Sequence, residues 1–189
     1  MALPRVRLRP AAPGRRPGQR AGFTLLELMI VLGIVSVLSA MALPTLGGML
    51  ARHQLLGAAR HLQADIAMAR QEALRAGRPA HLQFRPGAHW CYALSLGAPV
   101  DCAATGPAAG LLKRVSAEEH PQVLLLSAEP MALDGQSGLP LQPWPQAVLG
   151  TAEGARVALR LGPMGRASLC ADAGVAGQLP RCAPRPLPP

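Results

Sequence analysis

The sequence predicts an α+β protein in which a long N-terminal helix packs on a small antiparallel β-sheet domain. Three observations predict this fold class. Residues 23–76 are first uniformly apolar and then amphipathic with a helical period, before stop signals at Gly77 and Pro79. Beyond Pro79 the hydrophobic period changes to two, and glycine and proline turn signals separate the alternating segments. A length of 189 residues suits one domain plus an anchor.

Residues 1–22 form a basic leader that contains four prolines and no acidic residue. Six of the 19 basic residues of the chain lie in it, so most of the formal net charge of +9 belongs to the leader. The remainder is only mildly basic, and composition therefore does not point to a nucleic-acid partner. The positive-inside rule places such a leader in the cytoplasm. Its arginines are Arg5, Arg7, Arg9, Arg15, Arg16 and Arg20.

Residues 23–43 are predicted to form a membrane-spanning helix. No residue from Leu28 to Ala51 carries a formal charge, and these 24 positions exceed the about 20 apolar residues that a bilayer core requires. Glu27 is the exception near the start. A carboxylate at the bilayer centre costs on the order of 2.5–3.5 kcal/mol, and less near a helix end. Position alone allows either an interfacial carboxylate or one that pairs with a partner's cation.

The run Gly22-Phe23-Thr24-Leu25-Leu26-Glu27, followed by the apolar stretch, resembles the type IV prepilin signature. The whole layout is similar to that of H-type pseudopilins and FimT minor pilins. This resemblance implies that a prepilin peptidase cleaves after Gly22 and that the new N-terminal Phe23 is N-methylated. It also implies that Glu27 supports assembly by pairing with the N-terminal amine of a neighbouring subunit, as a buried carboxylate needs a cation. Pro44 resembles the proline at which pilin-like helices bend, and proline within a helix kinks it.

The resemblance implies a minor pseudopilin of a type II secretion system, assembled into a periplasmic pseudopilus that supports protein export. The alternative is a FimT-like minor pilin of a type IV pilus, with DNA binding during uptake as a further option. Both systems share the motif. The expected partners are the prepilin peptidase, other pseudopilins or pilins that contact the N-terminal helix, and the inner membrane. The expected location is a single pass through that membrane, with the C-terminal domain in the periplasm and later transfer into a filament.

A conventional secretory signal is the competing interpretation of the N-terminus. An arginine-rich leader, an apolar core and Ala40-Met41-Ala42 also fit a signal peptide with an A-x-A cleavage site. The mature protein would then be a soluble periplasmic protein that starts near Leu43. This interpretation leaves Glu27 unexplained.

Residues 44–78 are predicted to form the amphipathic half of the helix. One apolar stripe follows spacings of three and four residues. Asp65 and Glu72 lie on one face two turns apart, and the nearby Arg60, Arg70 and Arg75 predict ordinary surface ion pairs. The stripe consists of Leu55, Ala59, Leu62, Ile66, Ala69 and Ala73.

Residues 79–179 are predicted to form the β-sheet domain, and residues 180–189 an extended or mobile proline-rich tail. Residues 128–150 hold four prolines and are predicted to be a loop. The strand–turn–strand pattern at 156–170 is similar to the C-terminal half of H-type pseudopilin and FimT domains. The alternating patterns predict strands at 81–85, 90–96, 111–115, 123–127, 156–161 and 166–170.

Four cysteines, Cys91, Cys102, Cys170 and Cys182, lie beyond the apolar helix. An even number in an exported domain predicts disulfides. Three pairings exist, and the two short loops, Cys91–Cys102 and Cys170–Cys182, are favoured. The absence of a C-x-x-C pattern in the sequence argues against a structural zinc site.

The sequence carries no motif for catalysis: it lacks the P-loop, the G-x-S-x-G elbow and the H-E-x-x-H pattern. We therefore expect neither an enzyme nor a cofactor or metal site, and the five histidines are scattered. Arg166, Arg181 and Arg185 are the candidates for DNA contact, because several arginines can bind phosphates. Solvated charges on a loose tail are the favoured explanation of these three residues.

Overall fold

The computed structural model describes residues 23–87, 89–173 and 179–183, with the side chains of 41–46 and 173 left out. The predicted leader, including Gly22, and Arg185 therefore lie outside the described residues. The chain divides into two compact units, Met1–Ala42 and Leu43–Pro189. Each unit is described by itself below.

Helix α1 comprises Leu25–Ala76, so the predicted helix is confirmed to within two residues at its start. Its C-terminus ends where the sequence placed the stop signal. Gly77 adopts a left-handed φ of 62°, and the Arg78 N–H bonds the Ala73 carbonyl at 3.2 Å. This is a Schellman motif, which needs glycine because a Cβ is strained at positive φ.

The strands form two four-stranded sheets in which all neighbouring strands are antiparallel. The first has the order β3-β2-β1-β5, with β1 at Ala80–Arg85, β2 at Cys91–Leu96, β3 at Leu111–Ser116 and β5 at Met131–Leu133. A short 3-10 helix, η1, at Ala117–Glu119 follows β3. The second has the order β4-β6-β7-β8, with β4 at Leu124–Ala128, β6 at Gln146–Gly150, β7 at Arg156–Leu161 and β8 at Ala167–Ala173.

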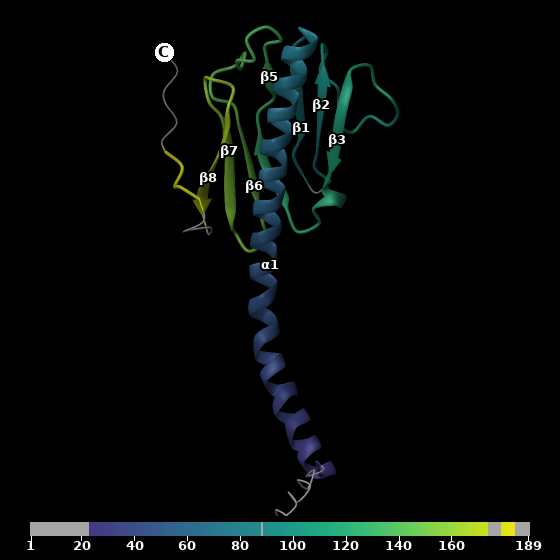
Figure 1. The fold of residues 1–189 in the computed structure, drawn as a ribbon, viewed down its shortest axis with the longest axis vertical. Helices are drawn as coiled ribbons and strands as arrows, with labels where there is room; N and C mark the ends of the chain where they lie inside the picture. The colour runs from purple at the N-terminus through teal and green to yellow at the C-terminus, as the bar shows by residue number, and fades with distance from the viewer. Residues whose placement is uncertain (1–22, 88, 174–178, 184–189) are drawn as a thin grey trace, which may run out of the picture. The chain divides into compact units, whose positions relative to one another are not determined.

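The hydrophobic core lies between the second half of α1 and both sheets (Figure 1). The predicted apolar stripe is confirmed, since none of its six side chains is more than 1% exposed. It packs with Leu82 and Leu94 of the first sheet and with Leu149 and Leu159 of the second in one buried cluster. A helix with one apolar face and two sheets with one apolar face each can bury all three surfaces only against one another.

The prediction of a loop over 128–150 is wrong, because this segment contains β5 and β6. β6 lies in the interior of the second sheet, between β4 and β7. Pro130 and Pro145 directly precede the two strands, where the missing N–H removes no bond of a strand interior. The prolines that suggested a loop therefore mark strand starts. The domain has two four-stranded sheets where one small sheet was predicted, with β5 at the edge of the first sheet and β6 joining β4 to β7 in the second.

The described part of the C-terminal tail, residues 180–183, is bonded to β8, whereas the prediction of an extended or mobile tail over 180–189 is not tested beyond residue 183. The Ala171 N–H donates to the Pro180 carbonyl at 2.8 Å, and the Cys182 N–H donates to the Ala171 carbonyl at 3.2 Å. A disulfide joins Cys170 to Cys182. These bonds cover part of the edge of β8, which would otherwise expose unpaired backbone groups.

By length and hydropathy, no helix in the described part of the chain is suited to cross a membrane. This criterion does not confirm the membrane span predicted for 23–43, part of which lies among the undescribed side chains of 41–46. The helical assignment of α1 continues through position 44. The kink predicted at Pro44 lies next to the junction of the two units and stays a prediction.

Candidate functional site

The start of α1 is organised by Thr24 and Glu27. Phe23, the first described residue, is 82% exposed. The Thr24 hydroxyl oxygen accepts a hydrogen bond from the Glu27 backbone N–H at 3.2 Å, which is the N-cap geometry of an S/T-x-x-E pattern. The exposed Glu27 carboxylate lies in the first helical turn, where the partial positive charge of the helix N-terminus favours an anion. The helix itself therefore gives Glu27 local stabilisation without a partner.

Thr24 caps the helix, a structural role that sequence reasoning missed. The signal was present, since Thr24-Leu25-Leu26-Glu27 has the spacing of a capping box directly before an apolar run. A helix that begins at Leu25 leaves Phe23 and its backbone N–H outside the helix. Phe23 is thus accessible to solvent in the described structure.

The segment from Phe23 to Leu38 exposes apolar side chains on every side of the helix that begins at Leu25. The exposed fraction of its large hydrophobic residues runs from 46% for Val31 to 82% for Phe23. A helix that is hydrophobic all round is stable only in an apolar environment, formed either by lipid or by other helices. Gly33 marks a notch of about 370 Å³ on this surface, together with Ile30, Ile34, Val37 and Leu38.

The notch offers room for close helix packing. A Cβ built on Gly33 would meet no atom within 4 Å. The Ser36 hydroxyl donates to the Gly33 carbonyl at 2.8 Å, so its polar group is satisfied inside its own helix. Small residues at such positions allow the backbones of two apolar helices to approach closely. This surface can therefore accept a second helix without leaving a polar group unpaired.

A buried ion pair fixes the second half of α1 against the first sheet. Asp65, only 5% exposed, accepts hydrogen bonds from Lys113 Nζ at 2.8 Å and from the Tyr92 hydroxyl at 2.7 Å. Burial and then the adjacent Asp65 raise the pKa of Tyr92 far above its usual range, so the hydroxyl stays a donor. The predicted surface ion pair is wrong for Asp65, whose partner is the single lysine of the chain. Glu72 does pair with Arg75, at 2.9 Å.

A cluster of stacked rings lies next to the Tyr92 side chain that bonds Asp65. Trp90 Nε1 donates to the Val123 carbonyl at 2.7 Å, and the Trp90 ring stacks near Tyr92 and His120 at centroid distances of 6.4 and 6.3 Å. Burial, and then the charge of His61, lower the pKa of His120. Among the described residues, no group of three or more His, Cys, Asp or Glu is arranged to hold a metal ion.

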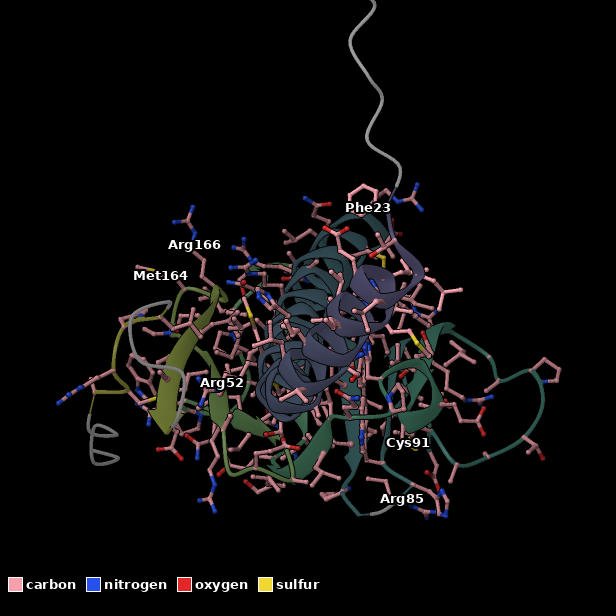
Figure 2. The ribbon with its side chains drawn as sticks, turned by 90° about the horizontal axis from the view of Figure 1, so that it is seen from below. Phe23, Arg52, Arg85, Cys91, Met164 and Arg166 are labelled. Atoms are coloured by element: carbon pink, nitrogen blue, oxygen red, sulfur yellow. A yellow bond between two sulfur atoms is a disulfide. The ribbon has the colours of Figure 1, made fainter. Side chains whose placement is uncertain are left out.

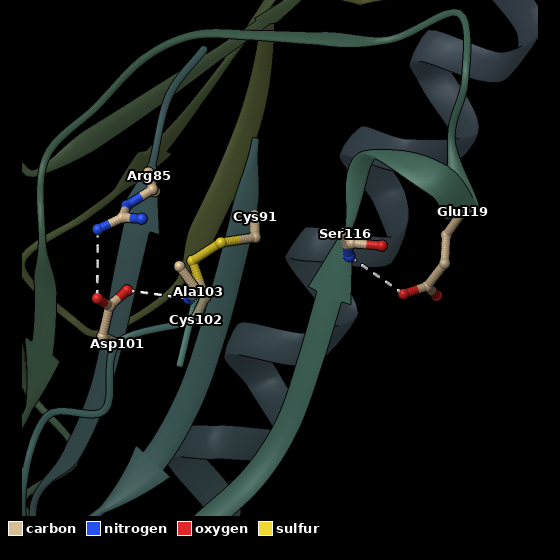
Figure 3. Close-up of a disulfide and its surroundings, with 7 residues drawn as sticks. All are labelled: Arg85, Cys91, Asp101, Cys102, Ala103, Ser116 and Glu119. Atoms are coloured by element: carbon tan, nitrogen blue, oxygen red, sulfur yellow. Dashed lines mark hydrogen bonds and ion pairs between the residues drawn. A yellow bond between two sulfur atoms is a disulfide. The ribbon is translucent and has the colours of Figure 1, made fainter. Parts of the chain in front are cut away.

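Two disulfides close the short loops that the sequence favoured, Cys91–Cys102 and Cys170–Cys182. Figure 3 shows the first disulfide beside an ion pair between Arg85 and Asp101, whose atoms lie 3.3 Å apart. The other Asp101 carboxylate oxygen accepts the Ala103 N–H at 2.9 Å. The loop that follows β2 is thus fixed at Cys102 by the disulfide to Cys91 and by the turn that Asp101 forms with Ala103.

The structure does not bring the candidate DNA-contacting arginines together. Arg166 lies in the turn before β8, whereas Arg181 bridges to Ala171, five residues further along. At about 3.3 Å per residue, these positions are about 16 Å apart along the strand. Arg185 lies outside the described residues. The described pair therefore forms no compact phosphate-binding cluster.

Two family models match the chain. The model described as "Prokaryotic N-terminal methylation motif" matches residues 18–43, and the model described as "Type II transport protein GspH" matches residues 58–180. Two crystal structures of the type IV minor pilin FimU from Pseudomonas aeruginosa are similar to it. The first is 22% identical with a TM-score of 0.47 over 64% of this chain and 94% of that one. The second is 21% identical with a TM-score of 0.44 over 62% and 97%. None of the curated proteins matches the chain.

Proposed function

The chain belongs to the family of the type II transport protein GspH, whose model matches more than half of it, and we propose that it is a minor pseudopilin of a type II secretion system. The order of two matches along one chain carries this proposal. The N-terminal methylation motif at 18–43 is followed by the GspH match at 58–180. Processing and assembly signals therefore precede a domain whose family is named for type II transport.

Processing occurs between Gly22 and Phe23, and the new amine of Phe23 is then methylated by the prepilin peptidase. The exposure of Phe23 and the start of the helix two residues later support this step, because a peptidase needs extended chain at its cleavage site. After cleavage, the N-terminal amine of one subunit pairs with the Glu27 carboxylate of its neighbour. The many exposed apolar side chains around Glu27 support this pairing, since an anion among packed apolar helices requires a cation.

The mature protein is anchored in the inner membrane by residues 23–43, with the leader in the cytoplasm before cleavage. The amphipathic half at 44–78, the β-sheet domain at 79–179 and the tail at 180–189 face the periplasm. The two disulfides support this location, because such bonds persist in oxidising compartments. The protein then acts as a structural subunit of a short filament, packing its helix against those of other pseudopilins.

Three alternatives lead to different experimental outcomes. A FimT-like minor pilin of a type IV pilus would carry the same methylation motif. A role in DNA uptake would add nucleic acid as a ligand of that pilin. A periplasmic protein with an ordinary signal peptide would lose residues up to Ala42. The GspH match favours type II secretion over these alternatives.

The test is deletion of the gene in its own host, with complementation by the wild-type protein, by Glu27→Ala or by the control Glu118→Ala. Glu118 is an exposed carboxylate of the β-sheet domain. We expect the deletion to abolish accumulation of exported proteins in the medium. Wild type and Glu118→Ala should restore it, whereas Glu27→Ala should be processed normally but restore it poorly.

Mass spectrometry of the extracted protein gives the mature N-terminus in the same strains. N-methylated Phe23 is expected. A start near Leu43 would contradict pilin-type processing and support the signal-peptide alternative. Normal secretion with loss of surface pili, or loss of DNA uptake alone, would instead assign the protein to a type IV pilus system.

A further inference from the structure

A groove lined by three arginines lies between the second half of α1 and the turn that joins β7 to β8. Arg60 and Arg70 come from α1 and Arg166 from the turn, around a volume of about 470 Å³. None of the described residues that line the groove carries a carboxylate. The groove therefore concentrates positive charge in an otherwise mildly basic domain. Figure 2 shows Arg166 and Met164 projecting outward from this turn.

The groove is elongated along the helix. Its α1 residues, from Arg60 to Leu74, recur at spacings of three and four and share one helix face. At about 1.5 Å per residue they extend over about 21 Å. Ala64 and Ala67 form an apolar floor between Arg60 and Arg70. This shape suits a segment of chain that carries separated charges better than a single small ion.

One wall of the groove is already fixed in place. Arg70 Nε donates to the Gly138 carbonyl at 2.9 Å, and Gln63 Nε2 donates to the Ala167 carbonyl at 2.8 Å. Gly165 has a φ of 69°, and a Cβ there would lie 2.2 Å from the Gly138 oxygen and 3.0 Å from Arg70 Nε. The turn can approach Arg70 this closely only because residue 165 is glycine. A ligand would therefore meet a pre-organised surface, which lowers the entropic cost of binding.

The charges of this groove are not neutralised within the described chain. Arg75 and Arg85 have carboxylate partners, Glu72 and Asp101. Arg60 and Arg166 are exposed and have no such partner among the described residues. The single bond of Arg70 uses its Nε, which leaves the terminal nitrogens of its guanidinium group available. These groups can form bidentate bonds to carboxylates.

We propose that the groove binds an acidic segment of a partner protein. Carboxylates of the segment bond the guanidinium groups of Arg60, Arg70 and Arg166, while the methylene groups of glutamate side chains lie on Ala64 and Ala67. The partner is a protein outside the filament, so binding of the segment does not require filament assembly. This interaction is thus separate from the function proposed above.

The composition of the groove favours protein over nucleic acid. None of its described lining residues is aromatic, so the groove lacks the aromatic side chains on which bases of single strands commonly stack. A phosphate backbone would leave the alanine floor uncovered. Arg181 lies about 16 Å further along β8 and adds no phosphate contact at the groove.

The test uses the full-length protein in micelles of a neutral detergent. A fluorescein-labelled peptide of alternating glutamate and alanine is titrated with it at low salt, and fluorescence anisotropy gives the Kd. We expect binding of this peptide, none of its glutamine–alanine counterpart, and weakening as salt rises. Arg60→Gln combined with Arg166→Gln should raise the Kd about tenfold, the sum expected for two partly exposed ion pairs.

The matched control combines Arg52→Gln with Arg156→Gln, which removes two exposed arginines that do not line the groove. It should leave the Kd unchanged. Both double variants should keep the melting temperature of the wild type, because all four side chains are exposed. Equal weakening by the control, or no peptide binding at low salt, would overturn the proposal. Tighter binding of a labelled single-stranded oligonucleotide, lost in the groove variant, would reassign the groove to nucleic acid.

Discussion

Replacement of Lys113 by methionine tests the buried ion pair most directly. The substitution keeps the length of the side chain and removes the charge that faces Asp65. The Asp65 side chain is 7% exposed and that of Lys113 is 29% exposed. After the change, the carboxylate would retain the Tyr92 hydroxyl at 2.7 Å but no cation among its described partners.

Removal of one partner from a fully buried ion pair costs about 3–5 kcal/mol of unfolding free energy. Because water reaches Lys113 from one side, we expect a value at or below the low end of this range, about 2–3 kcal/mol. The matched control is Arg75→Met. Its pair with Glu72 has almost the same length, 2.9 Å, but the side chains are 80% and 31% exposed. A pair of that kind contributes less than about 1 kcal/mol.

The assay is urea unfolding of the full-length protein, followed by tryptophan fluorescence, since Trp90 packs in the same aromatic cluster. A lower midpoint with an unchanged slope reports lost stability and not an altered unfolded state. The double variant Asp65→Asn with Lys113→Met should recover at least about 1 kcal/mol relative to the sum of the single changes. If Lys113→Met costs no more than Arg75→Met, the pair does not hold the helix on the sheet.

Further predictions concern a turn, the C-terminal disulfide and a partly buried histidine. Gly165→Ala should destabilise the domain by about 1–3 kcal/mol more than Gly154→Ala in urea unfolding. Both positions have positive φ, but only at Gly165 does a Cβ meet a backbone oxygen, 2.2 Å away. Cys170→Ser with Cys182→Ser opens a loop of 12 residues and should cost about 3 kcal/mol. Limited proteolysis should then cut the tail, whereas loss of the other disulfide, of separation 11, should leave the tail protected. Burial and then His61 lower the pKa of His120 below its ordinary 6.5, so the unfolded chain binds the proton first as pH falls. Stability should therefore decrease from pH 6.5 downward, and this part of the loss should disappear in His120→Gln, as measured by thermal unfolding.

The helix and most strands could be predicted because each has a local signal. The stripe from Leu55 to Ala73 repeats every three or four residues, and its six side chains are buried as that period requires. The turn before β8 was marked by Gly162 and Gly165. β5 escaped notice because three residues are too few to show alternation. The segment that forms β6 was predicted to be a loop because prolines precede it, although the strand itself contains apolar residues.

The candidate functional residues also divide into those with a local sequence signal and those whose partners are distant in the chain. Phe23 and Glu27 follow from a contiguous motif, and Thr24 could have been found from the capping spacing in the same run. Asp65 could not be matched to its partner, because Lys113 lies 48 residues away. Helix periodicity predicts that Asp65 pairs with arginines of the same helix. In the structure, Asp65 instead faces the first sheet, where it bonds Lys113.

The sequence by itself determined the processing motif, the length of α1, its buried face and the number of cysteines available for pairing. These features depend on neighbouring residues, so local chemistry and periodicity are sufficient. Only the tertiary structure decided that two sheets share one helix, that Asp65 bonds Lys113 and Tyr92, and that Arg60, Arg70 and Arg166 line one groove. Each of these contacts joins residues far apart in the chain, and their proximity depends on how the helix and both sheets bury their apolar faces together.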